Sequence, residues 1–165
     1  MTEYFYRRGY LHERIAIMSG ALAAATRIDD TLGQAISLRC LGSAFTETGN
    51  YDQAREFCEQ SLGLVAKLGG LDVEYGVRDT LGYIALHTGD FAEAAAHFEF
   101  ALDQSRHHGH RSHEADILAH LGDARYAAGE LPQARQAWQQ ALAIYDDIDH
   151  PDTDKIRAKL ASMKE

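Results

Sequence analysis

Small and apolar residues recur along this chain at an interval of forty residues. Glycines, leucines, Leu-Gly pairs and alanines each form a separate register with this interval. The members are Gly9, Gly49, Gly89 and Gly129; Leu22, Leu62, Leu102 and Leu142; Leu41-Gly42, Leu81-Gly82 and Leu121-Gly122; and Ala54, Ala94 and Ala134. One period kept in four registers without an insertion indicates a repeat architecture.

Each forty-residue unit is predicted to contain two helices. In the unit that begins at residue 31, Leu38, Leu41 and Phe45 fall on one face of a helix over about residues 31–48. Gly49 follows where a helix end favours a residue with positive φ, and Asn50 is suited to cap the next helix, as is Asp90 one unit later. No strand-like alternation competes with this pattern, so the fold class is all-α, built from antiparallel helix hairpins.

The repeated small residues predict close packing between helices. Gly42, Gly82 and Gly122 lie in the middle of predicted helices, where glycine costs about 1 kcal/mol relative to alanine. Three such positions in one register imply that another helix backbone passes close by, with Ala54, Ala94 and Ala134 on its surface. The side chains of Cys58, Phe98 and Trp138 share one register and are expected to fill the space between hairpins.

The repeat predicts one array over residues 1–165. Its parts are a truncated repeat at 1–30, full repeats at 31–70, 71–110 and 111–150, and a capping helix at 151–165 that starts at Pro151. By register, residues 1–8 are the end of a first helix, Gly9 is a turn and residues 10–28 are the second helix. This leaves Ile15, Ile17 and Leu22 partly uncovered, which favours either a piece of a longer array or a homodimer formed through this N-terminal hairpin.

The motif pattern resembles the tetratricopeptide repeat family over nearly the whole chain. The Leu-Gly pairs match the family, as do Gly49 with Tyr51 and Gly89 with Phe91, the central alanines, and the small residues Ser61, Ala101 and Ala141. Ala85 and Arg125 depart from the aromatic that Phe45 matches, the closing proline is absent, and the period exceeds the usual thirty-four or so. The resemblance implies a right-handed solenoid that binds proteins or peptides.

A second resemblance concerns the last thirty or so residues. The segment 137–145, followed by His150-Pro151 and by the segment 157–160, is similar to the C-terminal end of SARP-type transcriptional regulators. These are multidomain activators that place a DNA-binding domain and a switch ATPase before a tetratricopeptide array. The resemblance implies that this chain is the sensor or regulatory region of such a regulator, acting in signal transduction by contact with other domains or with a ligand.

Charge and cysteine content narrow the classes of function. The chain has 16 basic and 25 acidic residues, a net charge of −9, and no basic run longer than Arg7–Arg8. This argues against direct nucleic-acid contact and against a polybasic membrane patch. The sequence has no apolar stretch of membrane-spanning length, and its opening residues do not have the pattern of a signal peptide. Two cysteines, Cys40 and Cys58, are expected to be packing residues in a reducing compartment, so a cytoplasmic location is predicted.

Catalytic motifs are absent from the sequence, so we predict no enzyme activity, no cofactor and no metal. His12-Glu13 and His113-Glu114 lack the second histidine of a zincin helix. The run that contains His107, His108, His110 and His113 is the one motivation for a remote alternative, a metal-dependent enzyme. It falls in a predicted turn, where solvated histidines are more ordinary than metal ligands.

A partner-binding groove is the preferred functional hypothesis. In the family that the chain resembles, the first helix of each hairpin lines the concave surface. The residues that this implies are Arg39, Ser43, Glu47, Asp79, Tyr83, His87, Asp116, His120, Asp123 and Tyr126. The acids of the third unit suggest a ligand with basic groups. A free-standing adaptor or self-assembling scaffold is the alternative.

Overall fold

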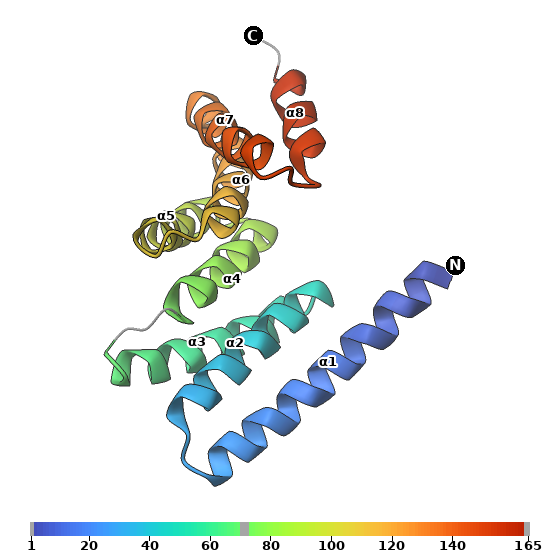
Figure 1. Ribbon diagram of the computed structural model, residues 1–165, viewed down its shortest axis with the longest axis vertical. Coiled ribbons are helices and arrows are strands. Elements are labelled where there is room, and N and C mark those ends of the chain that lie inside the picture. Colours follow the sequence, from blue (N-terminus) through green and yellow to red (C-terminus); the bar gives the residue numbers. More distant parts are fainter. Residues whose placement is uncertain (1, 70–72, 164–165) are drawn as a thin grey trace. The chain divides into compact units, whose positions relative to one another are not determined.

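The computed structural model describes residues 2–69 and 73–163, with side chains from Tyr10 onward. Over these residues the chain forms helices joined by short turns and contains no strand (Figure 1). The helices are α1 (Thr2–Arg27), α2 (Thr31–Glu47), α3 (Tyr51–Lys67), α4 (Val73–Thr88), α5 (Phe91–His107), α6 (Arg111–Ala127), α7 (Leu131–Asp147) and α8 (Thr153–Ser162). The chain divides into two compact units, residues 1–84 and 85–165.

The turns follow a rule that is stricter than the forty-residue period. A residue with positive φ recurs every twenty residues, and the set comprises Asp29, Gly49, Gly69, Gly89, Gly109, Gly129 and Asp149. Five of the seven are glycine, the residue that adopts this conformation without a steric penalty. The predicted turns at Gly49, Gly89 and Gly129 are confirmed.

Side-chain caps begin several of these helices. The carboxylate of Asp30 accepts a hydrogen bond from the backbone N–H of Gly33 at 2.9 Å, and that of Asp90 accepts one from Glu93 at 3.1 Å. The side-chain oxygen of Asn50 lies 3.4 Å from the backbone nitrogen of Gln53. The caps predicted at Asn50 and Asp90 are therefore confirmed.

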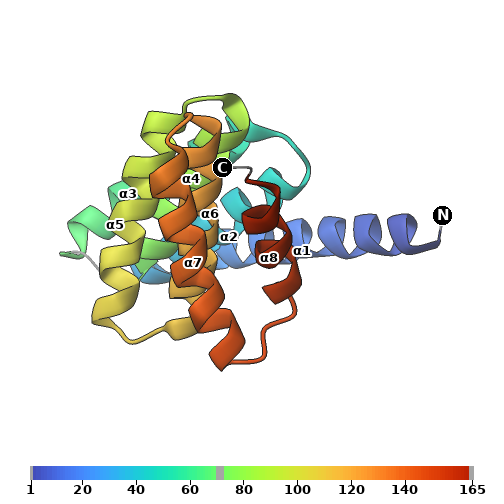
Figure 2. The same ribbon diagram turned by 90° about the horizontal axis from the view of Figure 1, so that it is seen from above.

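The turn predicted at Gly9 is wrong. Helix α1 runs without a break from Thr2 to Arg27, and its N-terminal end extends past α2 (Figure 2). A single glycine costs a helix only about 1 kcal/mol. The residue after it is Tyr10, which lacks the short polar side chain that caps a new helix at Asn50 and Asp90. Residues 2–27 are therefore one helix rather than the end of one and the start of another.

In the first unit, α1, α2 and α3 lie side by side, and α3 packs against α4 (Figure 1). Ala54, Cys58 and Leu81 belong to the buried core of this unit. A Cβ added at Gly42 would lie 2.5 Å from the Cys58 sulfur and 3.2 Å from the Ala54 carbonyl oxygen. The close helix approach that Gly42 predicted is confirmed.

In the second unit, α6 packs against both α5 and α7, and α8 packs against α7. A Cβ added at Gly122 would lie 2.3 Å from Cδ1 of Trp138, so this glycine admits an indole ring rather than a helix backbone. Phe98 and Trp138 are buried, as predicted. Helix α8 begins two residues after Pro151 and buries Ile156.

Candidate partner-binding surface

The residues predicted to line a groove come from α2, α4 and α6. In the first unit, Arg39 and Ser43 are partly buried on α2, and Asp79 and Tyr83 are partly buried on α4. The Arg39 side chain lies across Gly76, whose added Cβ would be 3.2 Å from Arg39 Cδ. The missing side chain of Gly76 on α4 thus leaves room for the Arg39 side chain from α2. The sequence pattern did not indicate this contact.

Glu47, at the end of α2, already has a partner within the chain. Its Oε1 lies 2.6 Å from Nη2 of Arg14 on α1. The glutamate side chain is half-exposed, so the pair is a surface salt bridge of modest energy. It ties α1 to α2 and reduces the negative charge that Glu47 would present to a partner.

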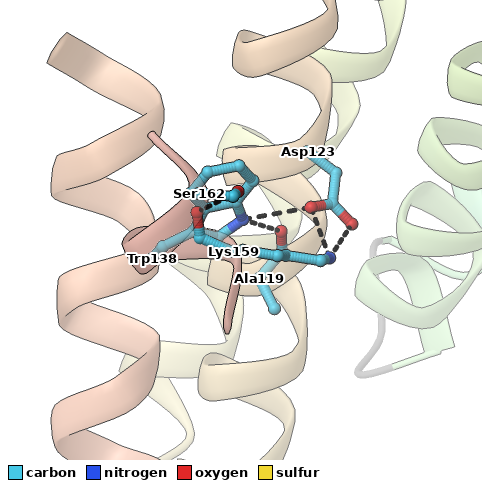
Figure 3. A network of polar contacts seen from close by, with 5 residues as sticks. All are labelled: Ala119, Asp123, Trp138, Lys159 and Ser162. Atoms are coloured by element: carbon cyan, nitrogen blue, oxygen red, sulfur yellow. Dashed lines mark hydrogen bonds and ion pairs between the residues drawn. The ribbon is translucent and has the colours of Figure 1, made fainter. Parts of the chain in front are cut away.

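Asp123, on α6, is the centre of a polar network (Figure 3). Its carboxylate oxygens accept hydrogen bonds from Nζ of Lys159 on α8 at 2.6 and 2.7 Å. Nε1 of Trp138 on α7 also donates to Asp123 at 3.0 Å and to the Ala119 carbonyl at 3.2 Å. The Lys159 ammonium lies 5.7 Å from the centroid of the Trp138 ring, within the range of a cation–π contact. Three helices are therefore joined at one carboxylate.

Asp116, one of the other predicted acids, is also engaged within the chain. Its Oδ1 accepts a 2.7 Å hydrogen bond from the hydroxyl of Tyr145, whose ring stacks on His150 at 4.3 Å. Burial, and then the hydrogen bond to Asp116, raises the pKa of the Tyr145 phenol above its usual range, so it remains a donor. Asp116 and Asp123 thus hold the second unit together, and the Lys159 ammonium balances the charge of Asp123.

Two of the remaining predicted residues of the second unit, His87 and Tyr126, are exposed, and the third, His120, is partly buried. His87 is exposed at the end of α4, and Tyr126 is 48% exposed at the end of α6. The ring of Tyr126 lies 5.4 Å from that of Trp138, and the ring of His120 lies 5.5 Å from that of Phe98. Buried aromatic rings thus orient the side chains of Tyr126 and His120, and Tyr126 offers a rigid, amphipathic contact surface.

Lys159→Met tests the contact between α8 and α6. We expect the free energy of unfolding to fall by about 1 kcal/mol, because a partly exposed, charge-assisted pair is lost while the aliphatic stem remains. Hydrogen exchange at the amides of residues 153–162 should accelerate. The control is Lys155→Met, which removes an exposed pair with Asp152, the residue that precedes α8. Equal exchange in the two variants would contradict a docking role for Lys159.

The predicted self-association residues do not share one environment. Ile17 is 63% exposed, whereas Ile15 and Leu22 are partly buried on the side of α1 that also carries the buried Ala25. Leu22 also lines an open pocket of about 400 Å³ with Leu38 and Leu64. Ile17 is therefore the one member of this set that is freely available on the surface.

The histidine run lies at the turn between α5 and α6. The rings of His108 and His110 lie 5.9 Å apart, and those of His110 and His113 lie 5.8 Å apart. Within the described part of the chain, no group of three or more His, Cys, Asp or Glu residues is arranged to hold a metal ion. Burial raises the pKa of the Cys58 thiol to about 12, so this sulfur stays protonated at neutral pH and is a poor nucleophile.

The short antiparallel helix pairs, with small residues at their contacts, define a helical-repeat protein. Two models of the tetratricopeptide repeat match the chain, one over residues 37–71 and the other over residues 77–147. Together they cover more than half of the sequence, and the chain belongs to the tetratricopeptide repeat family. The predicted all-α, tetratricopeptide-type fold is confirmed, and proteins of this family generally mediate protein–protein contacts.

Two similar proteins extend the comparison. Regulatory protein AfsR of Streptomyces griseus is 25% identical over 148 residues, which is 89% of this chain. The chain spans only 15% of the length of that relative. The crystal structure of BtubC (BKLC) from P. vanneervenii superimposes with a TM-score of 0.69 at 18% identity, covering 88% of this chain and 62% of that one. The second likeness concerns the fold alone. Among the described helices, none is both long enough and apolar enough to cross a membrane.

Sequence reasoning missed Lys159 and Tyr145 as partners of the predicted acids. Lys159 follows Asp123 by thirty-six residues and Tyr145 follows Asp116 by twenty-nine, so neither pair keeps the forty-residue period. Arg125 offered a signal, since it replaces an aromatic of the pattern. The structure shows it paired with Glu99 of α5.

Proposed function

We propose that this chain is a non-catalytic module that binds a protein or peptide through α2, α4 and α6, as one array of the predicted repeats. The accessible side chains of Tyr126 and His87, placed on the first helices of their hairpins, are the observation that carries the proposal. Rigid aromatic side chains give a large contact area at low entropic cost. Asp79 and Tyr83 contribute the corresponding surface in the first unit.

The likeness to a regulatory protein supports a narrower proposal. The module would be the sensor or regulatory region of a SARP-like transcriptional regulator in the cytoplasm. Occupancy of the binding surface, or its contact with other domains of the regulator, would shift that regulator between inactive and active states. Direct nucleic-acid contact, catalysis and a cofactor have no part in this proposal.

The test is a peptide-display selection on the purified chain, followed by affinity measurement with the enriched peptides. Tyr126→Ala and Tyr83→Ala should each weaken binding by about ten-fold, since an aromatic hot spot contributes at least about 1–2 kcal/mol. Leu131→Ala is the control, because Leu131 is an exposed apolar residue on α7 rather than on α6. The binding surface lies elsewhere if the peptides bind both tyrosine variants as tightly as the unaltered chain but bind the leucine variant more weakly.

The acids make poor test positions, although they belong to the predicted surface. Asp123→Lys would bring two ammonium groups together at the contact between α6 and α8. A loss of binding in that variant would report on the position of α8 as much as on the partner. The accessible tyrosine separates recognition from folding.

A further inference from the structure

Exposed apolar side chains gather along one side of α1. Among the described residues, the three most exposed large apolar side chains are Tyr10 at 62%, Ile17 at 63% and Ile28 at 70%. They are spaced by seven and eleven residues, so at 100° per residue they follow one stripe of α1 and its final turn. At the same rotation per residue, the buried Ala25 lies about 60° from this stripe and the half-buried Leu22 about 120° from it, so the stripe runs along the solvent side of the buried face. A row of exposed apolar side chains along one helix is a candidate interaction surface.

Small residues lie beside this stripe. Gly20 lies in the middle of α1, and a Cβ added there would meet nothing within 4 Å. Gly42 and Gly122 face close neighbours within the chain, whereas Gly20 faces none of the described atoms. Ala16 and Ala23 are exposed about 40° and 60° around the helix from Gly20, on the side away from the stripe. A helix that bears a glycine flanked by alanines allows a second helix backbone to approach closely.

Residues of opposite charge lie on either side of Gly20 along α1. Glu13 lies seven residues before Gly20 and Arg27 lies seven residues after it, and both are exposed. At 1.5 Å per residue, each charge lies about 10 Å along the helix axis from Gly20. At 100° per residue, Glu13, Gly20 and Arg27 all fall within about 40° of one line along the helix. The surface is therefore its own electrostatic complement when a second copy runs in the opposite direction.

We propose that this surface binds a second copy of the chain, with two α1 helices packed antiparallel about a two-fold axis at Gly20. In this register, Glu13 of one copy faces Arg27 of the other at both ends of the contact. Ile17 packs on Gly20 and Ala24 of the second copy, and Tyr10 packs on its Ile28. A parallel arrangement would instead place Glu13 against Glu13, so the charges select the antiparallel one.

The proposal goes beyond partner binding by a single module. A two-fold pair presents two copies of the binding surface in one particle, so a partner with two binding segments would be held by both at once. It also refines the predicted self-association surface, since Ile17 is retained and Ile15 and Leu22 are replaced by Tyr10, Glu13, Gly20, Arg27 and Ile28.

Sedimentation equilibrium on the 165-residue chain tests the pairing directly. We expect a particle of twice 18.3 kDa at micromolar concentration. Glu13→Arg and Arg27→Glu should each raise the dimer dissociation constant about ten-fold or more, because each places like charges together twice. The double variant Glu13→Arg with Arg27→Glu should restore the dimer. A monomeric unaltered chain, as expected if a preceding helix of a longer chain covers α1, would overturn the proposal.

Two further variants separate association from folding. Gly20→Leu should give a chain with a higher melting temperature, because leucine favours the helix and has room in the protomer, yet this chain should be monomeric. Glu56→Arg, a charge reversal on an exposed site of α3, should leave the dimer unchanged. A dimer that survives Gly20→Leu, or a double charge reversal that fails to restore pairing, would refute this register.

Discussion

Trp138→Ala is expected to lower the free energy of unfolding by about 4 kcal/mol, the largest effect of any single change considered for this chain. The indole is 3% exposed, contacts Gly122 closely and donates to both Asp123 and the Ala119 carbonyl. Removal of the ring leaves a cavity between α6 and α7 and takes one donor from Asp123. Urea titration followed by far-UV circular dichroism measures the change.

Trp138→Phe divides this effect into packing and hydrogen bonding. The smaller aromatic ring keeps much of the buried area but has no N–H donor, so we expect a loss of about 1–2 kcal/mol. If both substitutions reduced stability by less than about 1 kcal/mol, the indole would not be the main contact between the two helices.

Gly122→Ala is expected to lower the free energy of unfolding by about 2 kcal/mol, despite the better helix propensity of alanine. The added methyl would lie 2.3 Å from Cδ1 and 2.4 Å from Nε1 of Trp138, so the ring must shift and its hydrogen bonds must lengthen. The matched control is Gly63→Ala in α3, where a Cβ meets nothing within 4 Å. That change should raise stability by about 0.5–1 kcal/mol.

The two positions are coupled, which gives a sharper result than either alone. In the Trp138→Ala background the methyl added by Gly122→Ala enters the cavity, so this second substitution should now stabilise the chain by about 1 kcal/mol. If the double variant instead lost as much stability as the sum of the two single variants, Gly122 would not face the indole.

The sequence predicted the repeat fold well, because packing in a helical repeat is local and recurs at one register. Three of the confirmed features depend only on neighbours within one hairpin. They are the positive φ of Gly49, the helix cap at Asn50 and the close helix contact at Gly42. The turn predicted at Gly9 was wrong because Gly9 has the register of a turn glycine, but the residue after it is not a polar residue that caps a helix. Gly69 and Gly109 continue the turns of Gly49, Gly89 and Gly129 at a spacing of twenty residues, which a comparison at forty residues does not reveal.

The candidate surface was predicted less completely, for a physical reason. A register assigns a residue to a face of a helix but says nothing about which side chain from another helix reaches it. Asp116 and Asp123 were placed correctly on α6. Tyr145 of α7 donates a hydrogen bond to Asp116, and Lys159 of α8 forms an ion pair with Asp123. The partner of a long side chain such as that of Lys159 lies on another helix, so it depends on three-dimensional packing rather than on register.

The twenty-residue spacing of left-handed turns limits how such a gene can change in length. Insertion of one codon within a helix would rotate every later side chain of that helix by about 100° and move Gly42 or Gly122 away from the contact it allows. Duplication or deletion of a whole hairpin keeps each contact intact. Related genes should therefore differ in length by whole hairpins, or within the turns, and rarely by a few codons inside a helix.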